Sequence, residues 1–359
     1  MRFISTRFAG AIAAVLAAVL AASFFVSPAT AANPRGLYGT QDATYDGVFR
    51  QSLAIIALRS HGASVPVSAQ NWLIDQQCSD GAFEAFRADT SAACKDADLE
   101  AYSGKDSNST ALGALALLAL GKKAKAAKAV SWLRRAQNPD GGLPWLTGLE
   151  SDAASTALAM LAARSSGAPM FKKSGKTMVS FLRSTVLGCG VESNKRGAVS
   201  FQKSSPLVAN DLTTAQVAAA LSTTLPITPQ PRSSANVTFA CPGGVPSTNA
   251  GLKDVMAGYL SHRLADNKFT IPSAFGTGVD WSSTSWSVLA LLGARRGLAE
   301  ATKTVQQLRK NVDTVIRGGD ESIEPGKTAL LLLVVRAVGA KASDFGGVNL
   351  LKTLQGTLQ

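Results

Sequence analysis

The sequence has few of the residues that proteins use to bind transition metals. Its 359 residues include only two histidines, His61 and His262, and four cysteines, none of them spaced as C-x-x-C. Structural zinc sites draw on Cys and His ligands at short, regular spacings. This shortage argues against a zinc site, and we expect the protein to hold neither a metal nor a cofactor.

Long apolar runs are also scarce once the N-terminus is passed. Residues 9–26 are rich in Ala, Val and Leu, and two arginines, Arg2 and Arg7, precede them. Residues 29–31 form an A-x-A cleavage site. Downstream, the run at 329–335 is far too short to span a bilayer. We therefore expect residues 1–31 to be a cleaved signal peptide and residues 32–359 to be a secreted, extracytoplasmic domain, with an uncleaved anchor as the alternative.

Acidic residues are outnumbered by basic ones. The chain has 36 Lys and Arg against 24 Asp and Glu, a net charge of +12. Removing Arg2 and Arg7 with the signal peptide lowers the net charge to about +10, which suits an anionic ligand or surface. The lysines are scattered over helix faces and form no basic arm, so we expect a solvated outer face and no nucleic-acid partner.

The cysteines are even in number, which in an exported protein favours two disulfides. Proximity in the sequence favours Cys78 with Cys94 and Cys189 with Cys241. Three connectivities are possible for four cysteines, and spacing alone does not distinguish them.

The chain contains internal repeats. One pattern reads aromatic, Leu, three residues, Gln, two residues, Asp, Gly, and its two clear copies lie sixty residues apart. Its marked positions are Trp72, Gln77 and Gly81 in the first copy, and Trp132, Gln137 and Gly141 in the second. A worn third copy keeps the nine-residue step from Phe181 to Gly190. The glycines permit a positive φ where a helix ends, and the glutamines are placed to bond the turn while the tryptophans pack beneath. These residues are predicted to be structural.

A second pattern alternates with the first. Asp, then small polar residues, precedes a run of Ala and Leu at four places, which start at Asp106, Asp152, Asp211 and Asp280; Glu324 begins a fifth. A carboxylate in this context is a helix N-cap, because it accepts from the free amides of the first turn.

The helices that follow are of two kinds. The run at 110–120 is apolar on every side, whereas 122–137 is amphipathic, with its lysines and arginines on one face. Alternation of the two predicts an inner ring wrapped by an outer ring. Helix starts near Tyr45 and at the five acidic positions give about six hairpins, enough to close a circle. The sequence thus predicts an all-α fold, an α/α toroid with a central cavity, in one domain.

The repeats resemble known toroids. Trp132-Leu133, Gln137 and Gly141 are similar to the QW motif of squalene-hopene and oxidosqualene cyclases, whose toroid is shared by protein prenyltransferase β subunits. The run at 152–162 resembles inner-helix starts of the cobalamin carriers transcobalamin and intrinsic factor. The resemblance covers about residues 45–355 and implies a fold rather than an activity.

The catalytic residues of these relatives are not matched. Class II cyclases protonate an alkene with a DxDD motif, and the nearest string, Asp96-Ala97-Asp98-Leu99, lacks the final Asp. The zinc ligands of prenyltransferases have no counterpart at the required spacings. Residues 140–145 look similar to a turn of pectate-lyase-like toroids, whose basic cleft suits an acidic polysaccharide.

The expected binding site is the mouth where the inner helices begin. Its candidate ligand-binding residues are Tyr45, Asp106, Trp145, Asp152, Asp211, Asp280, Trp281 and Trp286. Simple capping explains each Asp, and core packing explains either of the last two tryptophans. Residues 222–249 are rich in Pro, Ser and Thr, and are predicted to be an insertion that overhangs a site or serves as a passive linker.

These observations favour a non-catalytic binding protein that captures a small organic molecule, with a corrinoid-like ligand as the specific form of the hypothesis. A membrane transporter or cell-surface protein would be its partner. The alternatives are a divergent terpenoid cyclase, an acidic-polysaccharide lyase, and a protein-interaction module at the cell surface.

Overall fold

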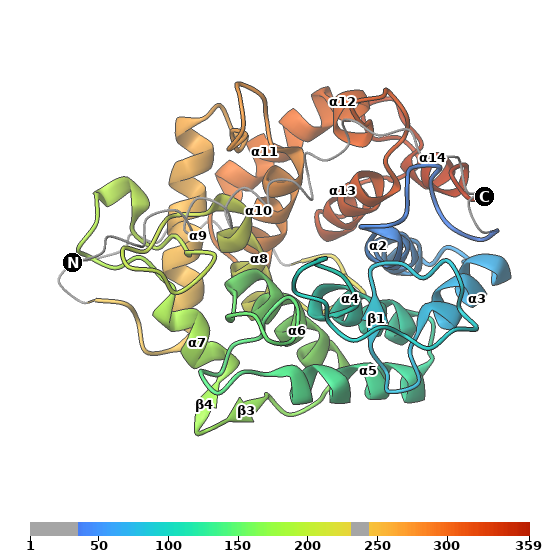
Figure 1. Ribbon diagram of the computed structural model, residues 1–359. Coiled ribbons are helices and arrows are strands. Elements are labelled where there is room, and N and C mark those ends of the chain that lie inside the picture. The colour runs from blue at the N-terminus through green and yellow to red at the C-terminus, as the bar shows by residue number, and fades with distance from the viewer. Residues whose placement is uncertain (1–34, 231–243) are drawn as a thin grey trace.

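The computed structural model describes residues 35–230 and 244–359. Six helices form an inner ring: α2 (Gly47–Ser60), α4 (Ser107–Ala119), α6 (Ala153–Ser166), α8 (Asp211–Ser222), α10 (Trp281–Ala294) and α13 (Pro325–Ala337). The outer helices are α3 (Val67–Gln76), α5 (Lys123–Ala136), α7 (Met178–Ser184), α9 (Asn249–Asp266), α11 (Leu298–Lys310) with α12 (Val312–Ile316), and α14 (Leu350–Gln355). The protein is an all-α toroid of six helical hairpins, as predicted (Figure 1).

Short strands and one 3-10 turn lie in the described loops between the helices. The antiparallel pair β1 (Phe83–Glu84) and β2 (Lys105–Asp106) places Phe83 opposite Asp106. The second antiparallel pair is β3 (Lys172–Lys173) with β4 (Lys176–Thr177), in which Lys172 lies opposite Thr177. A 3-10 turn, η1, spans Ser193–Lys195.

The inner ring is closed. Each inner helix packs on the next in chain order, and α13 returns to pack on α2. In α4 every residue except Asn108 and Leu118 is buried, whereas α5 buries one face and exposes its lysines. The predicted contrast between an all-apolar inner helix and a one-sided outer helix is confirmed for this hairpin.

The centre of the ring is packed with side chains. Most apolar residues of the inner helices have no accessible area at all, including runs such as Ile55–Leu58 in α2 and Leu331–Val335 in α13. A side chain that lined a cavity wide enough for water would retain accessible area. Leu, Val and Ala side chains therefore fill the deeper part of the space between the inner helices. Of the expected central cavity, the described residues leave at most a shallow opening at the helix starts, where Phe49, Leu212 and Trp281 are partly exposed.

The predicted insertion matches the connection between α8 and α9, residues 223–248, of which 231–243 lie outside the described residues. Its first part crosses the C-terminal ends of the inner helices. The Leu225 amide donates to Ser165 Oγ of α6, the Ile227 amide to Ser60 Oγ of α2, and the Gln230 amide to the Ala337 carbonyl of α13. This stretch therefore covers the end of the ring opposite the predicted mouth, rather than overhanging that mouth.

A threonine clasp joins the outer-helix turn to the next inner helix at four places in the ring. In four hairpins the Thr hydroxyl four residues after the N-cap donates to the N-cap carbonyl, at 2.6 Å, and accepts a backbone amide from the preceding turn. The amide and hydroxyl pairs are Phe83 with Thr110, Leu143 with Thr156, Val199 with Thr214, and Ile271 with Thr284, at 2.8–2.9 Å. Because each hydroxyl donates one hydrogen bond to the helix start and accepts one from the turn, it holds the two together.

The Gln and Gly positions of the first pattern have their predicted structural roles. Gln77 Nε2 donates to the Gly81 carbonyl within its own turn and to the Lys125 carbonyl of α5 in the next hairpin. Gly81 has φ +99°, and a Cβ there would lie 2.5 Å from the Lys128 backbone. In the third hairpin the equivalent glycine is Gly197, where an added Cβ would lie 2.3 Å from the Val255 carbonyl oxygen. It is not Gly190, because an insertion lengthens this turn.

Ring closure depends on the first hairpin, which has Arg50 where the others have the clasp threonine. Arg50 is buried, and its guanidinium donates to the carbonyls of Tyr38, Gln41 and Asp42 and pairs with Asp46. These bonds hold residues 36–46 against α2. Residues 36–39 in turn pair with 357–359 through three backbone hydrogen bonds of 2.8–2.9 Å, which joins the first and last hairpins.

We predict that Arg50→Met lowers the free energy of unfolding by about 3–5 kcal/mol, because it leaves buried carbonyls and the Asp46 carboxylate without their partner. Urea denaturation measures the change. Arg59→Met is the matched control: Arg59 is exposed and makes one hydrogen bond to the Ala119 carbonyl, so its loss costs about 1 kcal/mol or less. Equal losses in the two variants would contradict this role for Arg50.

Candidate functional site

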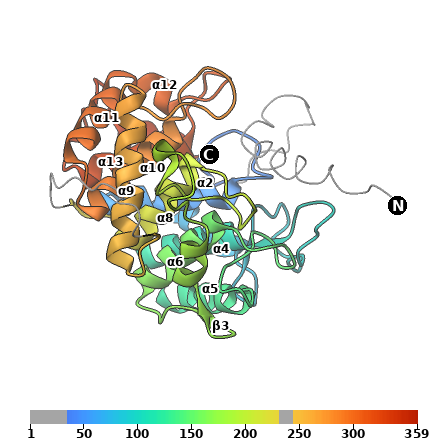
Figure 2. The same cartoon turned by 90° about the vertical axis from the view of Figure 1, so that its left-hand side faces the viewer.

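The loops that enter the inner helices gather on one face of the toroid, here called the N-terminal face. Neighbouring helix starts are tied together across it: the Ser107 amide of α4 donates to the Trp145 carbonyl, and the Ala153 amide of α6 to the Phe201 carbonyl. The loops project on the right of Figure 2. The N-terminal face is therefore the irregular side of an otherwise helical body.

Exposed apolar side chains concentrate on this face. Of the seven large hydrophobic residues that are exposed within residues 35–230 and 244–359, five lie in loops that precede an inner helix: Tyr45, Leu99, Tyr102, Val208 and Phe275. Tyr102 also stacks on Trp145, with ring centroids 6.3 Å apart. Such a concentration is typical of a surface that contacts a ligand or partner. None of the described helices combines the length and hydrophobicity needed to cross a bilayer.

Asp106 and Asp152 are buried N-caps, as the capping interpretation predicted. Each carboxylate accepts the backbone amide three residues on, Ser109 at 2.8 Å and Ser155 at 2.7 Å. Trp145 lies between them and bonds to both, through its indole to Asp106 and its backbone amide to Asp152. Burial raises the pKa of each carboxyl to about 6, against the lowering effect of these hydrogen bonds. Neither carboxylate faces open space.

The other two aspartates differ from each other. Asp280 caps α10 and accepts from both the amide and the hydroxyl of Ser283. The N-cap of α8, however, is Asn210, so the prediction that Asp211 is a cap is wrong by one residue. The pattern is kept by Asn210 and the clasp at Thr214, which leaves Asp211 free to pair with Arg263 and accept from the Tyr259 hydroxyl of α9.

The aromatic candidates lie in different environments. Trp286 is buried in the core, so its packing role is the one the structure supports. Trp281 is half-buried beside Ser285 and Lys327, in a crevice too narrow for a water molecule. Tyr45 is 64% exposed. The structure therefore does not bring the eight candidates together into one pocket.

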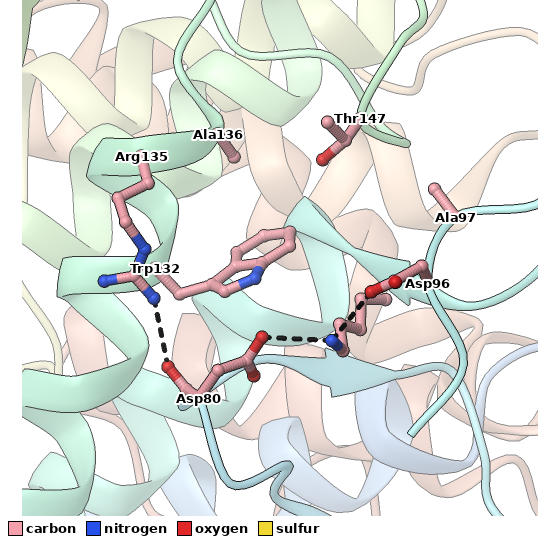
Figure 3. A pocket seen from close by; sticks show the side chains of 8 residues that line it. Asp80, Asp96, Ala97, Trp132, Arg135, Ala136 and Thr147 are labelled. Atoms are coloured by element: carbon pink, nitrogen blue, oxygen red, sulfur yellow. Dashed lines mark hydrogen bonds and ion pairs between the residues drawn. The ribbon is translucent and has the colours of Figure 1, made fainter. Parts of the chain in front are cut away.

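A pocket of about 350 Å³ does open beside the second hairpin (Figure 3). Its lining comes from four segments: Asp80, Asp96 with Ala97 and Lys105, Trp132 with Arg135 and Ala136, and Thr147. The Trp132 ring forms one wall, and charged side chains lie along the adjacent edge. The pocket thus combines an aromatic surface with groups of both charges.

Ion pairs and a disulfide position this lining. Lys105 Nζ lies 3.0 Å from Asp80 and 2.8 Å from Asp96, and Arg135 donates to the Asp80 carbonyl. The predicted disulfide between Cys78 and Cys94 is confirmed, with a Cα–Cα distance of 5.7 Å. It ties the loop that carries Asp96 to the turn that carries Asp80.

The second predicted disulfide is only partly described. Cys189 is disulfide-bonded, and Cys241 lies outside the described residues. Among the described residues, the one cluster with metal-ligand chemistry is Cys78, Glu84 and Cys94. Both of its sulfurs are in the disulfide, so no thiolate is available to bind a metal.

None of the eight predicted ligand-binding residues lines this pocket, whereas Trp132, predicted to be structural, does. Asp106 comes nearest in sequence, directly after Lys105, and Trp145 lies two residues before Thr147. Two sequence features pointed to the region: the QW-like turns, which supply Asp80 and Trp132, and the pair of nearby cysteines, which encloses the long loop.

Comparisons with known proteins show the fold. No protein-family model matches the sequence, and no curated protein matches it. Among solved structures, a protein from Actinoplanes is similar with a TM-score of 0.53 and 13% identity, over 86% of this chain and 95% of that chain. A variant of the type II terpene cyclase MstE from Scytonema, in complex with geranylgeranyl dihydroxybenzoate, has a TM-score of 0.50 and 14% identity over 97% of each chain. The terpenoid-cyclase-like toroid is thereby confirmed; no cobalamin carrier is among these similar structures.

The two buried caps predict an unusual pH dependence. Because the folded pKa values of Asp106 and Asp152 exceed the ordinary value of 3.8, the folded state binds more protons than the unfolded state between about pH 4 and 6. Their contribution therefore makes the protein more stable as pH falls from 7 to 4, by up to about 3 kcal/mol per group.

Asp106→Asn and Asp152→Asn should flatten that pH dependence, because Asn remains a good N-cap and carries no charge. Denaturation midpoints at pH 4, 5.5 and 7 provide the measurement. Asp98→Asn is the control, since that carboxyl is exposed and its pKa is lowered by hydrogen bonds from Ala101 and Glu100. The prediction fails if the Asn caps leave the pH profile unchanged.

Proposed function

We propose that the protein is an extracytoplasmic, non-catalytic binding protein that holds a small organic molecule on its N-terminal face, in the pocket beside Trp132. The observation that carries this proposal is the pocket itself, built from four chain segments on the face where exposed apolar side chains concentrate. Its volume of about 350 Å³ is in the range of small-molecule sites, about 300–1,000 Å³.

The lining suits a ligand with a flat apolar part and polar edges. Trp132 and Ala136 offer apolar contact, while Lys105, Arg135 and Thr147 can donate hydrogen bonds to peripheral groups. The stacked pair Tyr102 and Trp145 lies on the same face and extends the aromatic surface available to a larger ligand. A corrinoid-like macrocycle, with its planar ring and polar side groups, is larger than the pocket, so it would place only an edge there while its ring lies along this aromatic surface.

A non-catalytic role is supported by how the rim carboxylates are used. Asp106, Asp152 and Asp280 each accept the amide of their own helix, and Asp211 is paired with Arg263. A general acid or nucleophile needs an accessible reacting atom beside its substrate. In this proposal a membrane transporter or other cell-surface protein receives the loaded toroid through the apolar side chains of the N-terminal face.

A thermal-shift screen with cobalamin, other corrinoids and tetrapyrroles tests the proposal. A ligand present well above its Kd should raise the melting temperature by several degrees. Thr147→Trp should abolish the shift, because Thr147 is exposed and its replacement fills the pocket without entering the core. Thr302→Trp is the control, on the exposed side of α11. The proposal is overturned if no compound in the panel shifts the wild type, or if both variants respond alike.

The second candidate function is a divergent terpenoid cyclase, favoured by the similarity to MstE. The packed centre of the ring argues against it, since a polyene needs an enclosed chamber in which to fold. We expect no product when the protein is incubated with geranylgeranyl dihydroxybenzoate, squalene-like polyenes or uronic-acid polymers. A product that Asp280→Asn abolishes and Asp266→Asn leaves intact would establish an enzyme instead.

A further inference from the structure

One side of the toroid carries cations without acidic partners. Residues 122–176 contain ten Lys and Arg against three Asp and Glu, a net charge of +7 out of +12 for the whole chain. Nine of these cations are exposed on α5 and on the β3–β4 hairpin: Lys122, Lys123, Lys125, Lys128, Arg134, Arg135, Lys172, Lys173 and Lys176. We call this surface the α5 cationic face.

The cations of α5 form two rows along the helix. At about 100° per residue, Lys125, Lys128 and Arg135 follow one edge of the exposed side, and Lys123 and Arg134 follow the other. Between the rows the exposed residues are small: Ala124, Ala127 and Ser131. The helix therefore presents a shallow strip about 21 Å long with positive charge on both sides.

The β3–β4 hairpin widens this strip. Arg134 lies over the Phe171 ring, 5.4 Å from its centroid, and donates to the Pro169 carbonyl, while Lys173 Nζ donates to the Gln137 carbonyl at the end of α5. These contacts hold Lys172 and Lys176 beside the second row. The cations of two elements thus form one continuous surface.

The positive charge is not neutralised locally. Within the described parts of the chain, none of the nine side chains lies in an ion pair, whereas Lys105 and Arg263 elsewhere each pair with a carboxylate. Like charges held this close repel one another and weaken the fold slightly. An anion bound from outside would neutralise these charges and relieve the repulsion between them.

We propose that the α5 cationic face docks a linear, phosphate-bearing polymer outside the cell, through cations other than Arg135, which also lines the ligand pocket. Lysine predominates over arginine, seven to two, and an ammonium group binds phosphate as a point charge without fixed geometry. Two rows of such charges along a strip of small residues match a chain with regularly repeated charge. No large apolar side chain of α5 is exposed on the strip, and beside the hairpin only Met170 is, at 38%, which is too little apolar surface to anchor the face in a bilayer.

The test measures binding of long-chain inorganic polyphosphate, polygalacturonate and phosphatidylglycerol vesicles to the full chain at low salt. The variant Lys123→Gln, Lys128→Gln, Lys172→Gln removes charge from both rows and the hairpin. It should weaken polyphosphate binding by about 100-fold, about fivefold per lysine, and reduce the salt dependence of affinity. The control variant Lys310→Gln, Lys341→Gln, Lys352→Gln removes the same charge from exposed positions elsewhere and should bind nearly as the wild type does.

Each other outcome overturns the proposal. Equal weakening in the two variants would show an effect of net charge alone. Polygalacturonate or vesicles bound as tightly as polyphosphate would identify a different partner, and no binding by the wild type would leave a solvated surface. Thermal shifts by pocket ligands should be the same in both variants, which separates this result from the test of ligand capture.

Discussion

The fold depends on burying each inner helix on all sides. A helix such as α4, which after its first turn consists of Ala, Leu and Gly, has no face suited to water. It needs neighbours on both sides, an outer helix behind it and a filled centre in front. Only a closed ring gives every inner helix all four of these contacts. Closure is therefore the condition for stability of every hairpin, and it is completed by α13 on α2 and by the pairing of residues 36–39 with 357–359.

Much of this architecture could be predicted from the sequence, because it is repeated. The caps, the Gln and Gly turns and the contrast between helix types recur at matched spacings, and each has a local physical cause. The errors within the repeat pattern came where one repeat departs from the rest. Asn210 replaces Asp as a cap and shifts the pattern by one residue, and Gly197 replaces Gly190 because of an insertion. Arg50 replaces the clasp threonine in the first hairpin, where it holds residues 36–46 against α2.

The candidate site was far less predictable. Its lining joins residues from 80 to 147, and their proximity depends on the Cys78–Cys94 disulfide and on Lys105 bridging two aspartates. Neither ion pair follows from periodicity, which describes helices and says little of loops. The cysteine spacing was the one sequence feature that constrained the loop. The expected binding mouth at the inner-helix starts stays a prediction, because three of its aspartates cap their own helices and Asp211 pairs with Arg263.

Because the centre is packed, the residues that maintain the fold of this toroid differ from those proposed to bind its partners. When a ring encloses a chamber, inner-helix residues can face a substrate, and changes in them alter chemistry. Here those residues are Ala, Leu and Val in mutual contact, so a change in them affects stability first. In the functions proposed above, variation that alters what the molecule contacts would fall in the loops of the N-terminal face and on the outer surface of α5. These two surfaces differ in charge and in exposed aromatic groups, and each is supported by the same rigid ring, so they can engage different partners at the same time.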